Sequence, residues 1–156
     1  LVYPDDDGAA NWYSPTYSPQ TNLIYQNVRE KGGIYYLADA TYEPGKIYMG
    51  ASRRIVSGED PKGFLRALDP LTGDLVWEMA VQTPPWAGLM STAGGLVFSG
   101  TMEGDFFAAD ARNGDVLWRF QTGGRIYANP VTYFSEGRQF IAVAAGSALL
   151  TFSLPE

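Results

Sequence analysis

The sequence predicts an all-β fold made of propeller blades, about three to four of them, and two observations lead to this class. An eleven-residue pattern occurs twice: the segment from Ala67 to Trp77 returns 41 residues later as Ala108 to Trp118. A period of this length is that of a propeller blade or of an α-solenoid repeat. Each copy has a strand, a glycine turn and a second strand, and no stretch shows the 3.6-residue apolar spacing of a long amphipathic helix. The repeat is therefore a β blade.

The turn inside each copy depends on its glycine and its first aspartate. Gly73 and Gly114 supply the left-handed backbone that a tight turn needs, because glycine has no Cβ to clash at positive φ. Asp69 and Asp110 stand where a short carboxylate accepts hydrogen bonds from the turn amides. These carboxylates are therefore predicted to cap turns and not to serve as an acid–base pair. The Trp that closes each copy is expected to fill the space between neighbouring sheets.

The rest of the chain alternates short apolar or aromatic runs with turns rich in Gly and Pro, as short antiparallel strands require. A short apolar run at 47–50 follows a turn at 42–46. We expect residues 1–156 to form one domain that is a segment of a larger ring, because closed propellers have about four to eight blades. The predicted strands are 23–28, 34–40, 64–68, 75–79, 96–100, 105–109, 116–120, 131–133, 140–144 and 149–154.

Composition excludes several classes of function. The formal net charge of −6 argues against a nucleic-acid partner, since such proteins present a basic face. The chain has no His and no Cys, which excludes a Ser-His-Asp triad, thiolate nucleophiles, disulfides and the usual zinc sites. No apolar stretch is long enough for a transmembrane helix, and no signal peptide is visible, so the signal of an exported protein would lie outside this chain.

Two features near the amino end have structural interpretations. Asp5, Asp6 and Asp7 form a charge cluster, but an EF-hand loop would need Glu at position 16, where Thr16 stands, so a solvated loop is expected. Trp12 is expected to belong to the core, by the usual burial of this residue type.

Four stretches carry a resemblance to a known family. They are 11–19, 42–50, 85–98 and 137–143. In these stretches the sequence resembles the carboxy-terminal part of the pyrroloquinoline-quinone (PQQ) dependent alcohol dehydrogenases, the quinoproteins of the methanol and ethanol dehydrogenase group. The Ala-x-Asp repeat is similar to the tryptophan-docking motif of that family.

The resemblance implies an eight-bladed propeller in the periplasm with PQQ on its axis and Ca²⁺, or a lanthanide, at the edge of the quinone. An Asp would take the proton of a primary alcohol, and electrons would pass to a cytochrome c or a membrane quinone. By motif position, Asn11 would hydrogen-bond PQQ, Trp86 would stack on it, and Gly146 would offer a backbone contact. The residues after Gly146 do not match the Gly-Gly-Trp continuation of some members.

The resemblance leaves the catalytic residues outside this chain. The family's metal ligands, catalytic Asp and adjacent-cysteine disulfide belong to blades that would precede Leu1, so no catalytic or metal-binding residue is assigned here, and the chain alone is expected to be inactive. The alternative function is a propeller without chemistry that binds proteins as an outer-membrane assembly scaffold, which shares the docking repeat. A carbohydrate-binding module is disfavoured, because most aromatic residues fall in strands and repeat positions.

Overall fold

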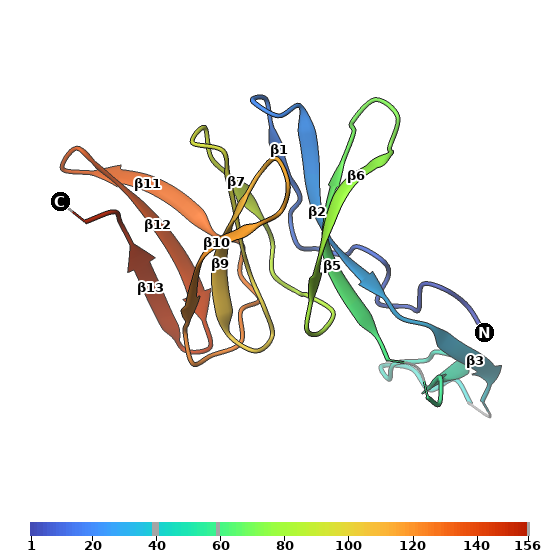
Figure 1. Cartoon of the computed structure of the whole chain (residues 1–156). Helices are drawn as coiled ribbons and strands as arrows, with labels where there is room; N and C mark the ends of the chain where they lie inside the picture. Colours follow the sequence, from blue (N-terminus) through green and yellow to red (C-terminus); the bar gives the residue numbers. More distant parts are fainter. Residues whose placement is uncertain (39–40, 59, 156) are drawn as a thin grey trace.

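The structure is a computed structural model and describes residues 1–38, 41–58 and 60–155. The described residues form strands and no α-helix, and the strands make antiparallel sheets that stand side by side like the blades of a fan (Figure 1). None of the described residues belongs to a helix that could span a membrane. The chain is therefore all-β and forms part of a propeller.

The first two sheets each have four strands, which follow one another along the chain from one edge of the sheet to the other. The repeat found in the sequence occupies the third and fourth strands of each sheet. The first sheet contains β1 (Thr16–Ser18), β2 (Leu23–Glu30), β5 (Lys62–Leu68) and β6 (Leu75–Val81). The second contains β7 (Met90–Ser91), β8 (Leu96–Gly100), β9 (Asp105–Asp110) and β10 (Val116–Gln121).

The third sheet contains β11 (Val131–Ser135), β12 (Arg138–Ala145) and β13 (Ala148–Phe152). A separate hairpin of β3 (Gly33–Leu37) and β4 (Ala51–Ile55) projects from the first sheet between β2 and β5 (Figure 1). The predicted strand at 34–40 corresponds to β3, with 39–40 outside the described residues. The apolar run at 47–50 is not a strand; the chain pairs only from Ala51 onward, opposite Leu37.

The core lies between the sheets because alternate residues of each inner strand point to the neighbouring blade. On β5, Leu65 and Ala67 are fully buried while the alternating residues Phe64, Arg66 and Leu68 are half-buried. One apolar cluster joins these residues to Val97 and Phe107 of the second sheet. A second cluster joins the second sheet to the third.

The repeat has the same local structure in both copies. The amide of Gly73 donates to the Asp69 carbonyl at 2.8 Å, and that of Gly114 donates to the Asp110 carbonyl at 2.9 Å. The first carboxylate oxygen of each Asp accepts from the amide two residues later, at 2.7 and 2.8 Å. The two glycines have φ of 78° and 80°. The prediction that these aspartates cap turns is confirmed.

The two closing tryptophans lie between neighbouring sheets. The indole Nε1 of Trp77 donates to the carbonyl of Ala111 at 3.2 Å, across from the first sheet to the second. Trp118 packs against Phe152 of the third sheet, with ring centroids 5.1 Å apart. Each Trp thus contacts the following blade.

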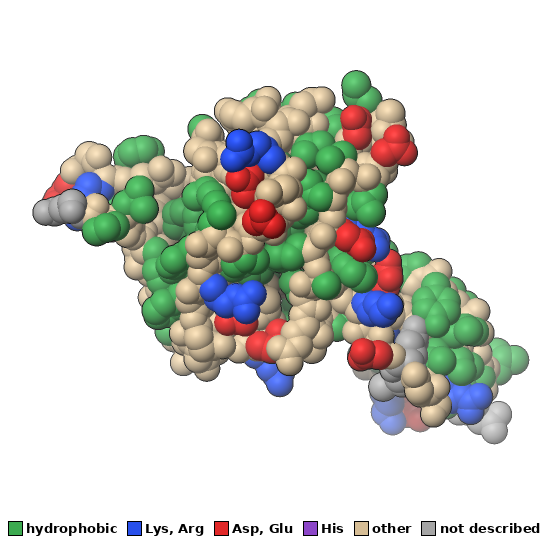
Figure 2. All heavy atoms as spheres, in the orientation of Figure 1, with side chains coloured by type: hydrophobic (Ala, Val, Ile, Leu, Met, Phe, Trp, Pro, Cys, Tyr) green, Lys and Arg blue, Asp and Glu red, His purple; other side chains and the backbone are tan. Residues whose placement is uncertain are grey.

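Over the visible face, acidic and basic side chains are intermingled with hydrophobic ones (Figure 2).

Candidate functional site

Four connecting segments meet at one end of the blades. They are the segment before β1, the β6–β7 connection, the β10–β11 connection and the β12–β13 turn. The amide of Leu89 donates to the Ser14 carbonyl at 3.0 Å, and Asn129 Nδ2 donates to Ser14 Oγ at the same distance. The amide of Gly146 donates to the Arg125 carbonyl at 2.9 Å. These bonds bring the sequence neighbourhoods of Asn11, Trp86 and Gly146 together.

The Pro-Trp-Ala-Gly stretch needs its glycine for close approach. A Cβ on Gly88 would overlap with the side-chain amide of Asn129. The Gly88 carbonyl accepts from Ser99 Oγ at 3.0 Å, and the Ala87 carbonyl accepts from the buried Asn27 Nδ2 at 2.8 Å. Hydrogen bonds from β2 and β8 therefore fix the loop that carries Trp86.

Trp86 is half-buried, and its ring has two close neighbours. The Arg29 guanidinium lies over the indole, 3.6 Å from the ring centroid, and the Tyr13 ring meets it at 88° with centroids 6.2 Å apart. Arg29 is itself 4% exposed and pairs with the Asp7 carboxylate at 3.2 Å. Because Arg29 covers one face of the indole, at most one face is left for a planar ligand.

Tyr13 links Trp86 to the segment that carries Asn11. Burial raises the pKa of the Tyr13 hydroxyl, while the positive charge of Arg29 and the nearby backbone of Asn11 act in the opposite direction. The Tyr13 hydroxyl has no hydrogen-bond partner among the described residues. Tyr13 therefore stays a neutral phenol, packed against Trp86 on one side and Trp12 on the other.

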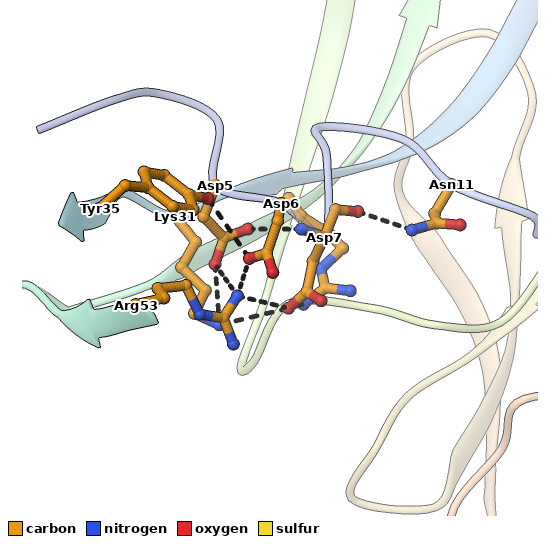
Figure 3. A network of polar contacts seen from close by, with 8 residues as sticks. Asp5, Asp6, Asp7, Asn11, Lys31, Tyr35 and Arg53 are labelled. Atoms are coloured by element: carbon orange, nitrogen blue, oxygen red, sulfur yellow. Dashed lines mark hydrogen bonds and ion pairs between the residues drawn. The ribbon is translucent and has the colours of Figure 1, made fainter. Parts of the chain in front are cut away.

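Asn11 is exposed, and its side chain makes two local hydrogen bonds. Its Nδ2 donates to the Asp7 carbonyl at 2.8 Å (Figure 3), and its Oδ1 accepts from the Trp12 amide at 2.8 Å. An amide side chain has two N–H donors and two acceptor lone pairs, so one of each is left for a ligand. The local bonds orient the Asn11 amide.

An open hollow of about 610 Å³ lies beside Trp12, the residue after Asn11, and of the three site residues predicted from the sequence only Gly146 is among those that line it. Aromatic and cationic side chains line it: Trp12, Tyr127 and Arg125, together with Gly146. Trp12 is 59% exposed, so the expectation that it belongs to the core is wrong. It points outward because Tyr13, the next residue, takes the buried position. Gly146 lies in the hollow as a backbone surface with φ of 57°.

The sequence analysis did not assign Arg29, Tyr13, Arg125 or Tyr127 to the site. Tyr127 had a usable signal, since it is an aromatic residue in a loop between glycines and a proline, as Trp86 is. Arg29 had none, because a basic residue inside a strand pattern predicts an exposed position. Its burial depends on Asp7, which lies 22 residues earlier in the chain.

The three aspartates near the amino end form an ion-pair network and not a solvated loop (Figure 3). Asp5 is 5% exposed and pairs with Lys31 at 2.9 Å and Arg53 at 3.3 Å. Arg53 also contacts Asp6, and Lys31 lies 3.3 Å from Asp7. The hydrogen bond that Lys31 donates to the Asp5 carboxylate raises the pKa of Lys31. The expectation of a solvated loop is wrong because the β2–β3 connection and β4 bring cations onto this segment.

The described residues contain no group of three or more His, Cys, Asp or Glu that could hold a metal ion. The aspartate network does not form one, since cations occupy the space between its carboxylates. The fold and the hollow define a segment of a propeller with a ligand-sized concave site at the ends of its blades.

Comparison with known proteins gives the family. Residues 61–154 match the PQQ-type repeat family described as outer membrane protein assembly factor BamB. This match covers more than half of the chain, which therefore belongs to that family of propeller repeats.

Similarity over nearly the whole chain is to quinoprotein alcohol dehydrogenases, as the sequence motifs predict. The chain is 41% identical over 146 residues to a quinoprotein ethanol dehydrogenase of Pseudomonas putida, covering 93% of this chain and 23% of that protein. It is 37% identical to a lanthanide-dependent methanol dehydrogenase of Methylacidiphilum fumariolicum, covering 93% of this chain and 24% of that protein. The solved quinohemoprotein alcohol dehydrogenase ADHIIG of Pseudomonas putida matches with a TM-score of 0.86 and 28% identity, over 96% of this chain and 24% of that one. The chain spans about a quarter of the length of these relatives.

Proposed function

We propose that this chain is part of a PQQ-dependent dehydrogenase that oxidises primary alcohols to aldehydes, and that it supplies one wall of the PQQ site. The observation that carries the proposal is the 41% identity to a quinoprotein ethanol dehydrogenase over 93% of the chain. The meeting of the four connecting segments at one end of the blades supports it, because ligands bind where such loops surround a concave surface.

The residues around the hollow fit a planar anionic cofactor. PQQ is a flat tricycle with three carboxylates, and flat ligands gain contact area from aromatic side chains with little entropy loss. In the lining of the hollow, Trp12 supplies such a surface and Arg125 brings a positive charge. Trp86 and Asn11 are not in that lining but are connected to it through Tyr13 and Trp12, and they add a second aromatic surface and a free N–H donor and acceptor. When bound, PQQ supplies the two-electron oxidation chemistry. In our proposal Asn11, Trp86 and Gly146 hold it, with Trp86 using the face that Arg29 leaves open.

The metal ligands and the catalytic base belong to other parts of the proposed protein, and the electron acceptor is a separate partner. We propose Ca²⁺ or a lanthanide, held by residues outside this chain together with a catalytic Asp, and transfer of electrons to a cytochrome c or a quinone in the periplasm. The remaining blades would complete the ring against the exposed faces of the outer sheets. The lanthanide dependence of one relative is the reason for keeping both kinds of metal.

A scaffold propeller is the second candidate, and the family description favours it in one respect. Residues 61–154, which contain the docking repeat, match repeats described for a BamB assembly factor. That region includes Trp86 but not Asn11. A scaffold needs no planar cofactor, so PQQ binding separates the two functions.

The first experiment measures PQQ binding and dye reduction with ethanol by the full-length protein, supplied with Ca²⁺ or a lanthanide. Trp86→Ala should lower PQQ retention after dialysis, whereas Leu71→Ala, at a position 87% exposed on a repeat turn, should not. Full-length protein that binds no PQQ under either metal would contradict the proposal and favour the scaffold.

A second experiment uses residues 1–156 alone. This chain should show no alcohol-dependent dye reduction, because a positioned general base alone accounts for about 10² to 10⁴ in rate and the proposed base lies elsewhere. Turnover by the isolated chain would show that the active site has been placed in the wrong part of the protein.

A further inference from the structure

Arg29 occupies an unusual position for a charged residue. It is the only basic residue among the buried polar residues that the structure describes. It stands near the end of β2, where its backbone amide donates to the Ala9 carbonyl at 2.8 Å. A buried cation is strongly disfavoured unless it is paired, so its surroundings must compensate the lost hydration.

Two groups provide that compensation. The Asp7 carboxylate accepts from Arg29 Nη2 at 3.2 Å, and the Trp86 indole offers its negative face to the guanidinium at 3.6 Å. The guanidinium makes few other interactions, since its Nε and Nη1 have no hydrogen-bond partner among the described residues. The stacking contact with Trp86 is therefore a main part of what holds Arg29 in place, and Arg29 in turn holds the indole.

Asp7 connects this pair to the other candidate residue. Its carboxylate binds Arg29, and its backbone carbonyl accepts from Asn11 Nδ2 at 2.8 Å (Figure 3). A single residue thus couples the orientation of the Asn11 amide to that of the Trp86 ring. A simple apolar neighbour for Trp86 could fill the same space but could not make this link.

We propose that Arg29 is a positioning residue for the cofactor site, which fixes the plane of Trp86 and ties it through Asp7 to Asn11. This inference rests on the proposed function, since it concerns how PQQ is held. Lys cannot replace Arg here, because an ammonium lacks the planar surface that stacks on an indole and the fork that reaches a carboxylate at the same time.

The test is a double-mutant cycle on PQQ affinity in the full-length apoprotein. Arg29→Lys should weaken PQQ binding about tenfold, the effect of losing a desolvated cation–π contact. In the Trp86→Phe background the same substitution should change affinity by less than about twofold, because coupled residues are not additive. The matched control is Arg66→Lys. That guanidinium also lies over an aromatic ring, Phe64, at 4.8 Å, but outside the site, and its loss should leave PQQ affinity unchanged.

A second measurement detects the contact between Arg29 and Trp86 in the absence of PQQ. In protein labelled with 5-fluorotryptophan, the ¹⁹F resonance of Trp86 is identified by its absence in Trp86→Phe. It should move in Arg29→Lys and stay in place in Arg66→Lys. Should Arg29→Lys fail to fold, Asp7→Asn replaces it, since this variant removes the carboxylate partner of Arg29 and should move the same resonance and weaken PQQ binding.

The outcomes separate this inference from the proposed function. The positioning role would be overturned if Arg29→Lys bound PQQ with wild-type affinity. It would also be overturned if the loss of affinity in the double variant were the full product of the losses in Arg29→Lys and Trp86→Phe. Either result would leave the proposed cofactor site in place. A wild-type protein that binds no PQQ would overturn the proposed function, and the positioning role with it.

Discussion

The two glycines of the repeat provide a matched test of tryptophan docking. Gly73 and Gly114 have φ of 78° and 80° at equivalent turns. A Cβ at position 73 meets nothing within 4 Å, whereas a Cβ at position 114 would lie 2.7 Å from Cε3 of Trp77. Replacing each glycine by Ala in the chain of residues 1–156 therefore separates backbone strain, which both variants share, from the steric effect on the docked indole.

The expected magnitudes follow from these contacts. An L-residue in the left-handed region costs about 1–2 kcal/mol, and this is the whole effect expected for Gly73→Ala. Gly114→Ala adds overpacking of about 1–3 kcal/mol. The indole cannot move away freely, because its Nε1 donates to Ala111 and its ring lies against Tyr25, with centroids 5.7 Å apart. We expect Gly114→Ala to lower the free energy of unfolding by about 1–3 kcal/mol more than Gly73→Ala does.

The assay is urea unfolding of both variants and the wild type, compared through their midpoints at equal m-values. In a Trp77→Phe background the gap between the two glycine variants should narrow, since the smaller ring leaves room for the methyl group. Equal losses of stability, or a larger loss for Gly73→Ala, would refute the view that Trp77 is held against Gly114.

Three further predictions concern other contacts. Asn27→Leu should lower the free energy of unfolding by about 1–3 kcal/mol, because it leaves the buried carbonyl that its amide binds without a donor; a neutral result in urea unfolding would contradict this. The hydrogen bonds from Arg112 lower the pKa of Asp110 to about 2, so their stabilising contribution is present above about pH 4 and is lost as the pH falls toward 2. In Arg112→Gln, the carboxyl ¹³C titration of Asp110 should move back toward its ordinary pKa, and an unchanged titration would refute the pairing. Gly88→Ala should destabilise the chain by about 1–3 kcal/mol, because the new methyl group displaces Asn129; thermal unfolding at the wild-type temperature would argue against that close approach.

The blades could be predicted from the sequence because the interactions that form them join residues close together in the chain. Strand alternation, the glycine turns and the capping aspartates act over a few residues, so the repeat around Gly73 and Gly114 predicted both the turns and the docking tryptophans. The apolar run at 47–50, to which the sequence assigned no element, shows the limit of this reasoning. An apolar run such as Ile47 to Gly50 becomes a strand only if a partner strand pairs with it, and β3 pairs instead with the residues from Ala51 onward.

The candidate site depended on contacts between distant parts of the chain. Asn11, Trp86 and Gly146 could be selected from motifs, but their surroundings could not. Ser14 meets Asn129 across 115 residues. The burial of Arg29 arises only when Asp7 and Trp86 are brought to the end of β2.

The sequence by itself determined an all-β repeat, its turn chemistry and the kind of protein it resembles, because spacing and residue type are enough for interactions within a hairpin. Only the tertiary structure decided which charged and aromatic residues near the amino end are buried and which are exposed. Asp5 is buried because Lys31 comes to it from the β2–β3 connection and Arg53 from β4, and Trp12 is exposed because Tyr13 occupies the core. The physical reason is that the free energy of a charge or a large ring depends on which groups surround it, and the fold supplies those groups from remote segments.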